Sequence, residues 1–74
     1  MKATLLGYST FISKKSGNQS MVIGYGYEDQ RWKGLHIEQK FVNPDNVEGI
    51  LKPGSTIEID FNSGGYVVGL KALD

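Results

Sequence analysis

Polar and apolar residues alternate along most of the chain, and turn-forming residues interrupt the alternation at short intervals. In residues 55–61, Ile57, Ile59 and Phe61 alternate with polar side chains, which predicts a strand with one buried and one solvated face. Residues 35–42 alternate in the same way. No helical period persists over the length that a helix needs. The pattern predicts an all-β protein.

The turn signals divide the chain into five expected strands. These strands are residues 2–13, 20–27, 35–42, 55–61 and 66–73. Gly7 inside the first strand predicts a bulge or bend, which lets one long strand pair with neighbours on two sides. Between the third and fourth strands, residues 47–51 are long enough for a single helical turn, capped by Asn43 or Asp45.

Three strands, a short helical turn and two further strands follow one another in the order of an OB-fold. That fold is a five-stranded, partly open Greek-key barrel that binds oligomers with a sheet face and its loops. We therefore expect a five-stranded OB-like barrel that occupies residues 1–74 as a single domain. An SH3-like barrel has a similar number of strands and is the alternative.

The chain has 74 residues and no cysteine, so its core is small and no disulfide stabilises it. Association adds buried surface to such a small core, and we expect a homodimer. One histidine and scattered carboxylates form a poor ligand set, so no metal or other cofactor is expected. No signal peptide or membrane-spanning segment is evident, which predicts a cytoplasmic protein without a membrane partner.

The formal net charge is zero, but the charges are unevenly distributed. Residues 1–40 have a surplus of three positive charges, and residues 41–74 have a surplus of three negative charges. The two halves could form a basic and an acidic face, or folding could mix them into an ordinary surface.

Catalytic residues are not evident. His36 is the only histidine, and no glycine-framed serine nucleophile accompanies it. We expect His36 on a solvated strand face. The Gly24-Tyr25-Gly26 segment does not open a helix, so it does not form a phosphate-binding loop. The sequence predicts a protein that is not an enzyme.

Two hairpin loops combine the residue types that bind single strands. Lys14 and Lys15 lie in the first loop, and Arg31, Trp32 and Lys33 lie in the second. Cations contact phosphates, and an aromatic ring stacks on a base for about 1–3 kcal/mol. Trp32 could serve in this way, or it could fold back to cap the core.

Tyrosines are the other candidates for stacking. Tyr25 and Tyr27 share a strand face with core residues, and Tyr66 lies at the tip of the last hairpin. We expect one or two of the four tyrosines to face a ligand. Gly24 and Gly26 leave the opposite face of their strand bare, either for close backbone approach or for a flat ligand.

The chain resembles the small OB-fold single-stranded-DNA-binding proteins of the filamentous-phage gene V type. The resemblance covers most of the length and rests on four segments. These are residues 13–18 (SKKSGN), 25–27 (YGY), 51–57 (LKPGSTI) and 65–70 (GYVVGL). The loop that contains Trp32 has no counterpart in that family.

This resemblance implies cooperative, sequence-tolerant binding of single strands by a dimer, with DNA favoured over RNA. By position, Lys14 and Lys15 would contact phosphates, Tyr25 or Tyr27 would stack on bases, and Tyr66 would lie near an aromatic hairpin tip. The principal alternative is a non-enzymatic protein-interaction or assembly module of a phage or mobile element. An enzyme subunit or small-ligand binder is the weakest of the three interpretations, because side chains fill a small barrel.

Overall fold

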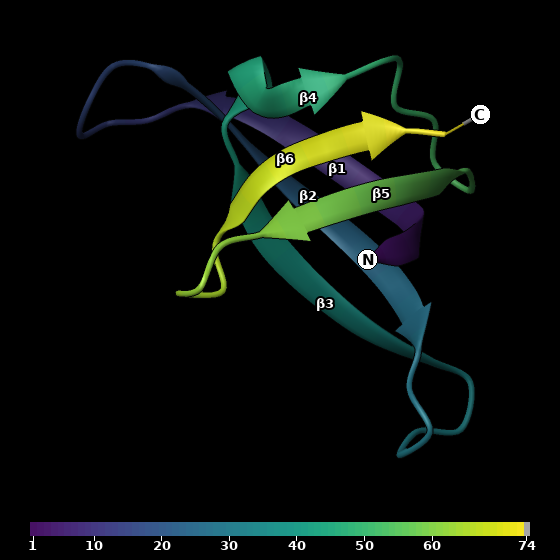
Figure 1. Ribbon diagram of the computed structural model, residues 1–74. Coiled ribbons are helices and arrows are strands. Elements are labelled where there is room, and N and C mark those ends of the chain that lie inside the picture. Colours follow the sequence, from purple (N-terminus) through teal and green to yellow (C-terminus); the bar gives the residue numbers. More distant parts are fainter. Residues whose placement is uncertain (74) are drawn as a thin grey trace.

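The computed structural model describes residues 1–73 and contains six β-strands and one 3₁₀ turn (Figure 1). The strands are β1 (Lys2–Ile12), β2 (Gln19–Glu28), β3 (Leu35–Val42), β4 (Val47–Glu48), β5 (Thr56–Phe61) and β6 (Val67–Ala72), and the turn is η1 (Pro44–Asn46). The all-β class is confirmed. The five longer strands match the expected ones to within a residue or so at each end. Among the described residues, no helix is long and apolar enough to cross a membrane.

All six strands of residues 1–73 belong to one sheet, in the order β3-β2-β1-β5-β6-β4. Neighbouring strands are antiparallel except β4, which pairs with β6 in parallel. The long strand β1 has two partners, because its first residues pair with β5 and the rest pairs with β2. The register of β1 against β2 shifts between Leu5 and Gly7, so the expected bulge at Gly7 is confirmed.

The prediction of a five-stranded barrel is wrong. β4 is a sixth strand beside β6, and the sheet does not close. Its curvature brings β3 close to β6, but no ladder joins these two strands within residues 1–73. The two-residue strand β4 lies outside β6 and cannot bridge to β3. An open seam therefore runs between β3 and β6.

The helical turn forms earlier than expected. Pro44 fixes the backbone for the first position of a turn. The Asn43 Oδ1 atom accepts a hydrogen bond from the Asp45 amide at 3.0 Å, so Asn43 is the cap. Residues 47 and 48 are then extended and pair with β6 instead of continuing the turn.

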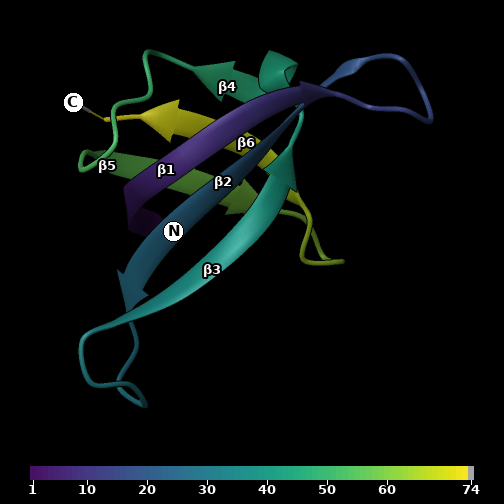
Figure 2. The ribbon, with the colours of Figure 1, turned by 180° about the vertical axis from the view of Figure 1, so that it is seen from behind.

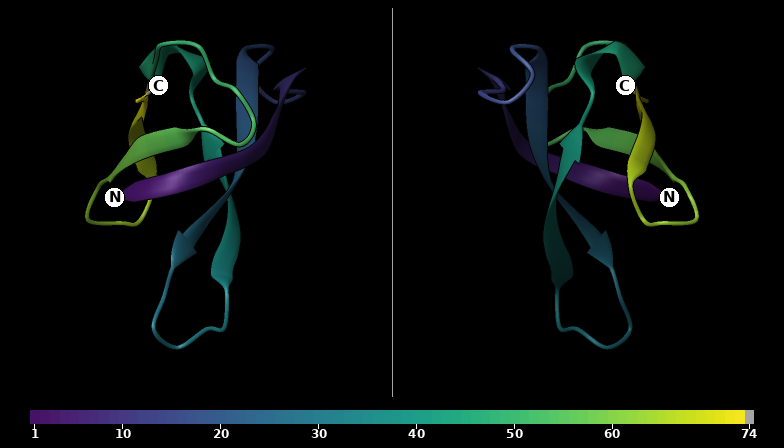
Figure 3. Two further views of the ribbon diagram at one scale, coloured as in Figure 1. Left: turned by 90° about the vertical axis from the view of Figure 1, so that its right-hand side faces the viewer. Right: turned by 90° about the vertical axis from the view of Figure 1, so that its left-hand side faces the viewer.

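The two halves of the chain lie on opposite sides of the core. β1, β2 and β3 form one curved layer, and β4, β5 and β6 lie across its inner side (Figures 2 and 3). Folding therefore keeps the basic first half apart from most of the acidic second half. The core between the layers consists of Ala3, Leu5, Met21, Ile23, Tyr25, Val42, Leu51, Ile57, Ile59, Val67 and Leu70.

Candidate nucleic-acid interface

β3 turns His36, Glu38 and Lys40 toward the inside of the curved sheet and most of its apolar side chains toward solvent. The register sets this orientation, because Glu38 pairs with the fully buried Tyr25 and His36 pairs with Tyr27. The expectation that His36 lies on a solvated face is wrong, since its side chain is only 20% exposed. The inward row is His36, Glu38, Lys40 and Val42, and the outward row is Leu35, Ile37, Gln39 and Phe41.

Four rings stack in a row on the inner side, toward the tip of the β2–β3 hairpin. Trp32 stacks on His36 with ring centroids 4.5 Å apart, and His36 stacks on Tyr27 at 5.1 Å. Tyr25 follows at 6.1 Å from Tyr27 and lies in the core. We call these four side chains the ring column. Its outer end is Trp32, which stacks on His36 and is still 53% exposed.

Asp29 builds the loop that holds Trp32 in place. Its Oδ1 atom accepts hydrogen bonds from the Arg31 amide at 3.0 Å and from Arg31 Nε at 3.2 Å. The Asp29 carbonyl accepts a bond from the Trp32 amide at 2.9 Å, which closes a turn. Aspartate favours such turns because its side chain bonds to the backbone two residues on. Gly34, with φ +82°, completes the return to β3.

The charges beside the ring column are largely paired. Asp29 Oδ2 lies 3.0 Å from Arg31 Nη2 and 3.2 Å from His36 Nδ1. The bonds from Arg31, with a further contribution from His36, hold the pKa of Asp29 well below its usual range. Glu38 accepts a hydrogen bond from the Tyr25 hydroxyl at 3.1 Å and lies 3.5 Å from His36 Nε2.

Both core-side tyrosines of the column hold their protons more tightly than free tyrosine. Burial and the bonded Glu38 carboxylate raise the pKa of Tyr25 to about 12. Partial burial, followed by the carboxylates of Glu38 and Asp29, raises the pKa of Tyr27. The tyrosines of the column are therefore neutral at physiological pH.

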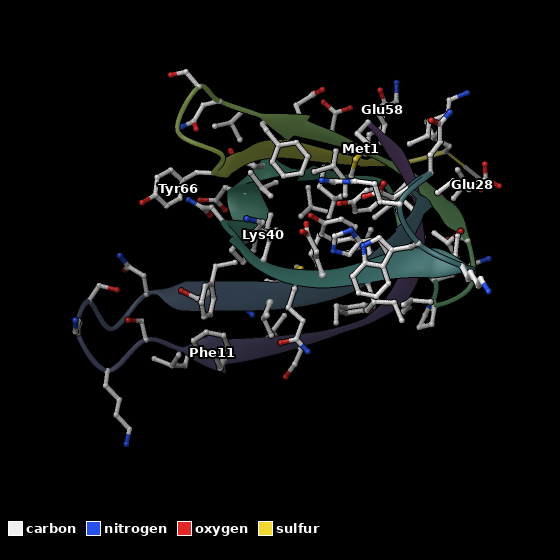
Figure 4. All side chains as sticks on the ribbon, turned by 90° about the horizontal axis from the view of Figure 1, so that it is seen from below. Met1, Phe11, Glu28, Lys40, Glu58 and Tyr66 are labelled. Carbon is white, nitrogen blue, oxygen red and sulfur yellow. The ribbon has the colours of Figure 1, made fainter. Side chains whose placement is uncertain are left out.

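A second aromatic site lies across the open seam. A groove of about 350 Å³ is lined by Lys40 and Phe41 of β3 and by the β5–β6 hairpin, including Tyr66. Tyr66 and Phe41 are both 73% exposed. Lys40 points from β3 toward the opposite layer, and Tyr66 lies on the same side of the molecule (Figure 4). The Asn62 side chain shapes the hairpin by accepting bonds from the amides of Gly64 and Tyr66.

The structure places the expected site residues in separate groups. Lys14 and Lys15 occupy the β1–β2 loop at one end of the molecule, whereas residues 29–34 form the tip at the other end (Figure 1). The longest dimension of the molecule is 39 Å. Among residues 1–73, no ion pair involves a lysine, so the lysine charges are not neutralised by a direct partner.

Two of the expected site residues are less able to contact a nucleic acid than the sequence suggested. Tyr25 is fully buried, so it cannot offer a ring face to a base. Arg31 directs its guanidinium to Asp29, although the side chain is 83% exposed. For Trp32 the sequence left two alternatives open, an exposed ring and a ring folded back onto the protein. The structure has features of both, because one side of the ring contacts His36 while the rest stays in solvent.

Sequence reasoning missed Lys40, Phe41 and the part that His36 plays in the ring column. The alternation in β3 placed these residues on two faces but did not show which face is turned inward. Within the described part of the chain, no group of three or more histidine, aspartate and glutamate side chains is arranged to hold a metal ion.

Comparison with known proteins does not extend this description, since no family model, curated protein or solved structure matches the chain. The resemblance to the gene V type therefore stays a prediction.

Proposed function

We propose that this protein binds single-stranded nucleic acid, DNA in preference to RNA, with little sequence specificity. The observation that carries the proposal is the ring column, which ends in a half-exposed Trp32 next to Lys33 in the sequence. A base stacked on the exposed part of the indole would gain about 1–3 kcal/mol. The adjacent Lys33 would hold the phosphate of the stacked nucleotide.

The fold supports this site when it is viewed as an open relative of the OB-fold. OB-folds bind oligonucleotides with the face of their second and third strands, together with the loops between strands 1 and 2 and between strands 4 and 5. In this chain the corresponding loops contain Lys14 and Lys15 and, in the β5–β6 hairpin, Tyr66. The inner row of β3 connects the two ends through Lys40.

We infer that a strand follows the inner side of β3 from Trp32 to the seam groove, where Tyr66 offers a further ring. β3 has eight residues and is about 26 Å long. A binding site of this length is at the low end of the roughly 4–16 nucleotides that one OB-fold covers. Lys14 and Lys15 extend the cationic path beyond Val42.

Titration with a single-stranded oligonucleotide tests the proposal, with Trp32, the single tryptophan of the chain, as the probe. We expect quenching of its fluorescence and weaker binding as salt rises. Contacts with three or four phosphates predict a slope of log K against log salt of about −2 to −3. Absence of salt-sensitive binding, also by anisotropy of a labelled strand, would refute the proposal.

Matched lysine variants locate the site. Lys33→Ala and Lys40→Ala should each weaken binding and flatten the salt dependence, because each removes one phosphate contact. Lys71→Ala is the control, since Lys71 is an exposed lysine of β6 in the acidic half. Equal losses in all three variants would mean that binding is not localised on the inner side of β3.

A protein-interaction module is the second candidate function. The observation that favours it is the exposed outward row of β3, where Ile37 is 63% and Phe41 73% exposed. Stable association of the chain without oligonucleotide affinity would favour this candidate.

A further inference from the structure

The outer face of the β1–β2–β3 layer is the side turned away from β4, β5 and β6 (Figure 2). Most of the side chains on it are apolar or uncharged. Directly paired residues of antiparallel strands lie on the same face, so the registers define this surface. Its exposed apolar members are Leu6, Phe11, Leu35, Ile37 and Phe41, and Thr4, Ser9, Ser20, Val22 and Gln39 lie among them. We call this surface the outer face. Within residues 1–73, the charged residues on it are Lys2 and Glu28, both at one end.

Glycines make a hollow in the middle of the outer face. Gly7 of β1 pairs with Gly24 of β2, and Gln39 of β3 lies next in the same row. Together with neighbouring residues they line a depression of about 340 Å³. A Cβ atom built on Gly7 would have nothing within 4 Å, so the hollow is open to solvent. Beside it, Phe41 projects from β3 and contacts Phe11 edge-on, with ring centroids 6.2 Å apart.

We propose that the outer face is a dimer interface, and that its occupant is the outer face of a second copy of this chain. The proposal does not depend on the nucleic-acid function, because the proposed strand path lies on the inner side of the layer. Back-to-back pairing would leave both inner sides accessible.

The surface has the size and shape that pairing with itself needs. The five exposed apolar side chains offer on the order of 500 Å² per copy, taking about 200 Å² for a full aromatic side chain. Two copies would bury about 1,000 Å² before the backbone is counted, which is the lower limit for a specific interface. A two-fold axis between the hollow and Phe41 would place each Phe41 over the hollow of the other copy.

Charge disfavours a nucleic acid as the occupant of this face and permits a second copy. A phosphate backbone needs cations, and within residues 1–73 the outer face has Lys2 alone, at its end beside Glu28. Lys14 and Lys15 lie in the β1–β2 loop at one end of the layer, outside the apolar centre. We therefore expect screening by salt to have little effect on dimerisation, whereas nucleic-acid binding weakens as salt rises.

Sedimentation velocity of the nuclease-treated full chain, over a wide concentration range and at two salt concentrations, tests the proposal. We expect a concentration-dependent dimer. Ile37→Lys should raise its dissociation constant about tenfold or more, because it buries an unpaired charge at the centre of the interface. Gly24→Val should weaken the dimer as well, because it fills the hollow while the face stays apolar.

Val68→Lys is the matched control, since Val68 is an exposed apolar strand residue of β6 outside the outer face. It should leave the dissociation constant unchanged, and circular dichroism should show that every variant keeps its fold. A wild-type chain that remains monomeric at all concentrations would overturn the proposal. A dimer that survives Ile37→Lys would also overturn it and would point to the free edge of β3. The oligonucleotide titration tests nucleic-acid binding independently, so a failure of the dimer proposal can be distinguished from a failure of the proposed function.

Discussion

Two glycines of β2 lie on the same face two residues apart, and the structure predicts opposite effects for the same substitution in each. A Cβ atom at Gly24 would have its nearest neighbours at 3.9 and 4.0 Å, which are ordinary contacts. A Cβ atom at Gly26 would lie 3.1 Å from Leu35 Cδ1 and 3.3 Å from Leu35 Cβ. The Cβ atom of Leu35 is fixed to the backbone of β3, so it cannot rotate away.

The magnitudes follow from these distances. Gly24→Ala should stabilise the fold by about 0.4–1 kcal/mol, because it restricts the unfolded chain without creating a clash. Gly26→Ala should have the same entropic benefit, but crowding against Leu35 costs about 1–3 kcal/mol. The two variants should therefore differ by roughly 2 kcal/mol, which for a domain of this size is about 10 °C in Tm.

Urea and thermal unfolding at low protein concentration, followed by circular dichroism, measure this difference without a contribution from association. The m-value should be unchanged, since neither variant alters the surface exposed on unfolding. Equal effects of the two substitutions, or a loss of stability in Gly24→Ala, would refute the packing described for this face.

Three further predictions concern side-chain bonds. Because the pKa of Tyr25 is about 12 in the fold and about 10 when unfolded, stability should fall as pH rises from about 10 to 12, and Tyr25→Phe should remove that part of the loss. Asp29→Asn should destabilise the protein at neutral pH. Because the pKa of Asp29 is depressed in the fold, the free energies of unfolding in urea of the unsubstituted protein and of Asp29→Asn should converge as pH falls below about 4. Asn62→Ala removes the acceptor of two amide bonds, so it should cost about 1–2 kcal/mol in unfolding experiments and increase exchange of the Tyr66 amide.

The sequence predicted the strands better than it predicted their orientation. The turn-forming residues on either side of residues 35–42 predicted both ends of β3. The alternation within β3 could not show that the apolar row faces solvent, since the pairing of Glu38 with the buried Tyr25 decides this. The sequence did not predict β4, because a strand of two residues is too short to show an alternation of apolar and polar side chains.

For the candidate site, the sequence identified loop residues but not their surroundings. Trp32 was expected at a hairpin tip and is found there. Its stacking on His36 depends on the turn that Asp29 closes and on a residue from the next strand. Lys40 was missed because a single lysine inside a strand is usually solvated, and its proximity to Tyr66 arises from curvature of the whole sheet.

The pairing of β1 with β5 has a consequence for biosynthesis. Ala3 pairs with Ile57, and the Leu5 amide bonds to the Ser55 carbonyl at 2.9 Å. This edge of β1 therefore stays unpaired until a segment about 50 residues later has been synthesised. At a synthesis rate of about 5–20 residues per second, this delay is roughly 3–10 s. During that interval β1, β2 and β3 can form a local meander with neither face covered. The nascent chain is therefore most exposed to aggregation, and most in need of a chaperone, before β5 leaves the ribosome.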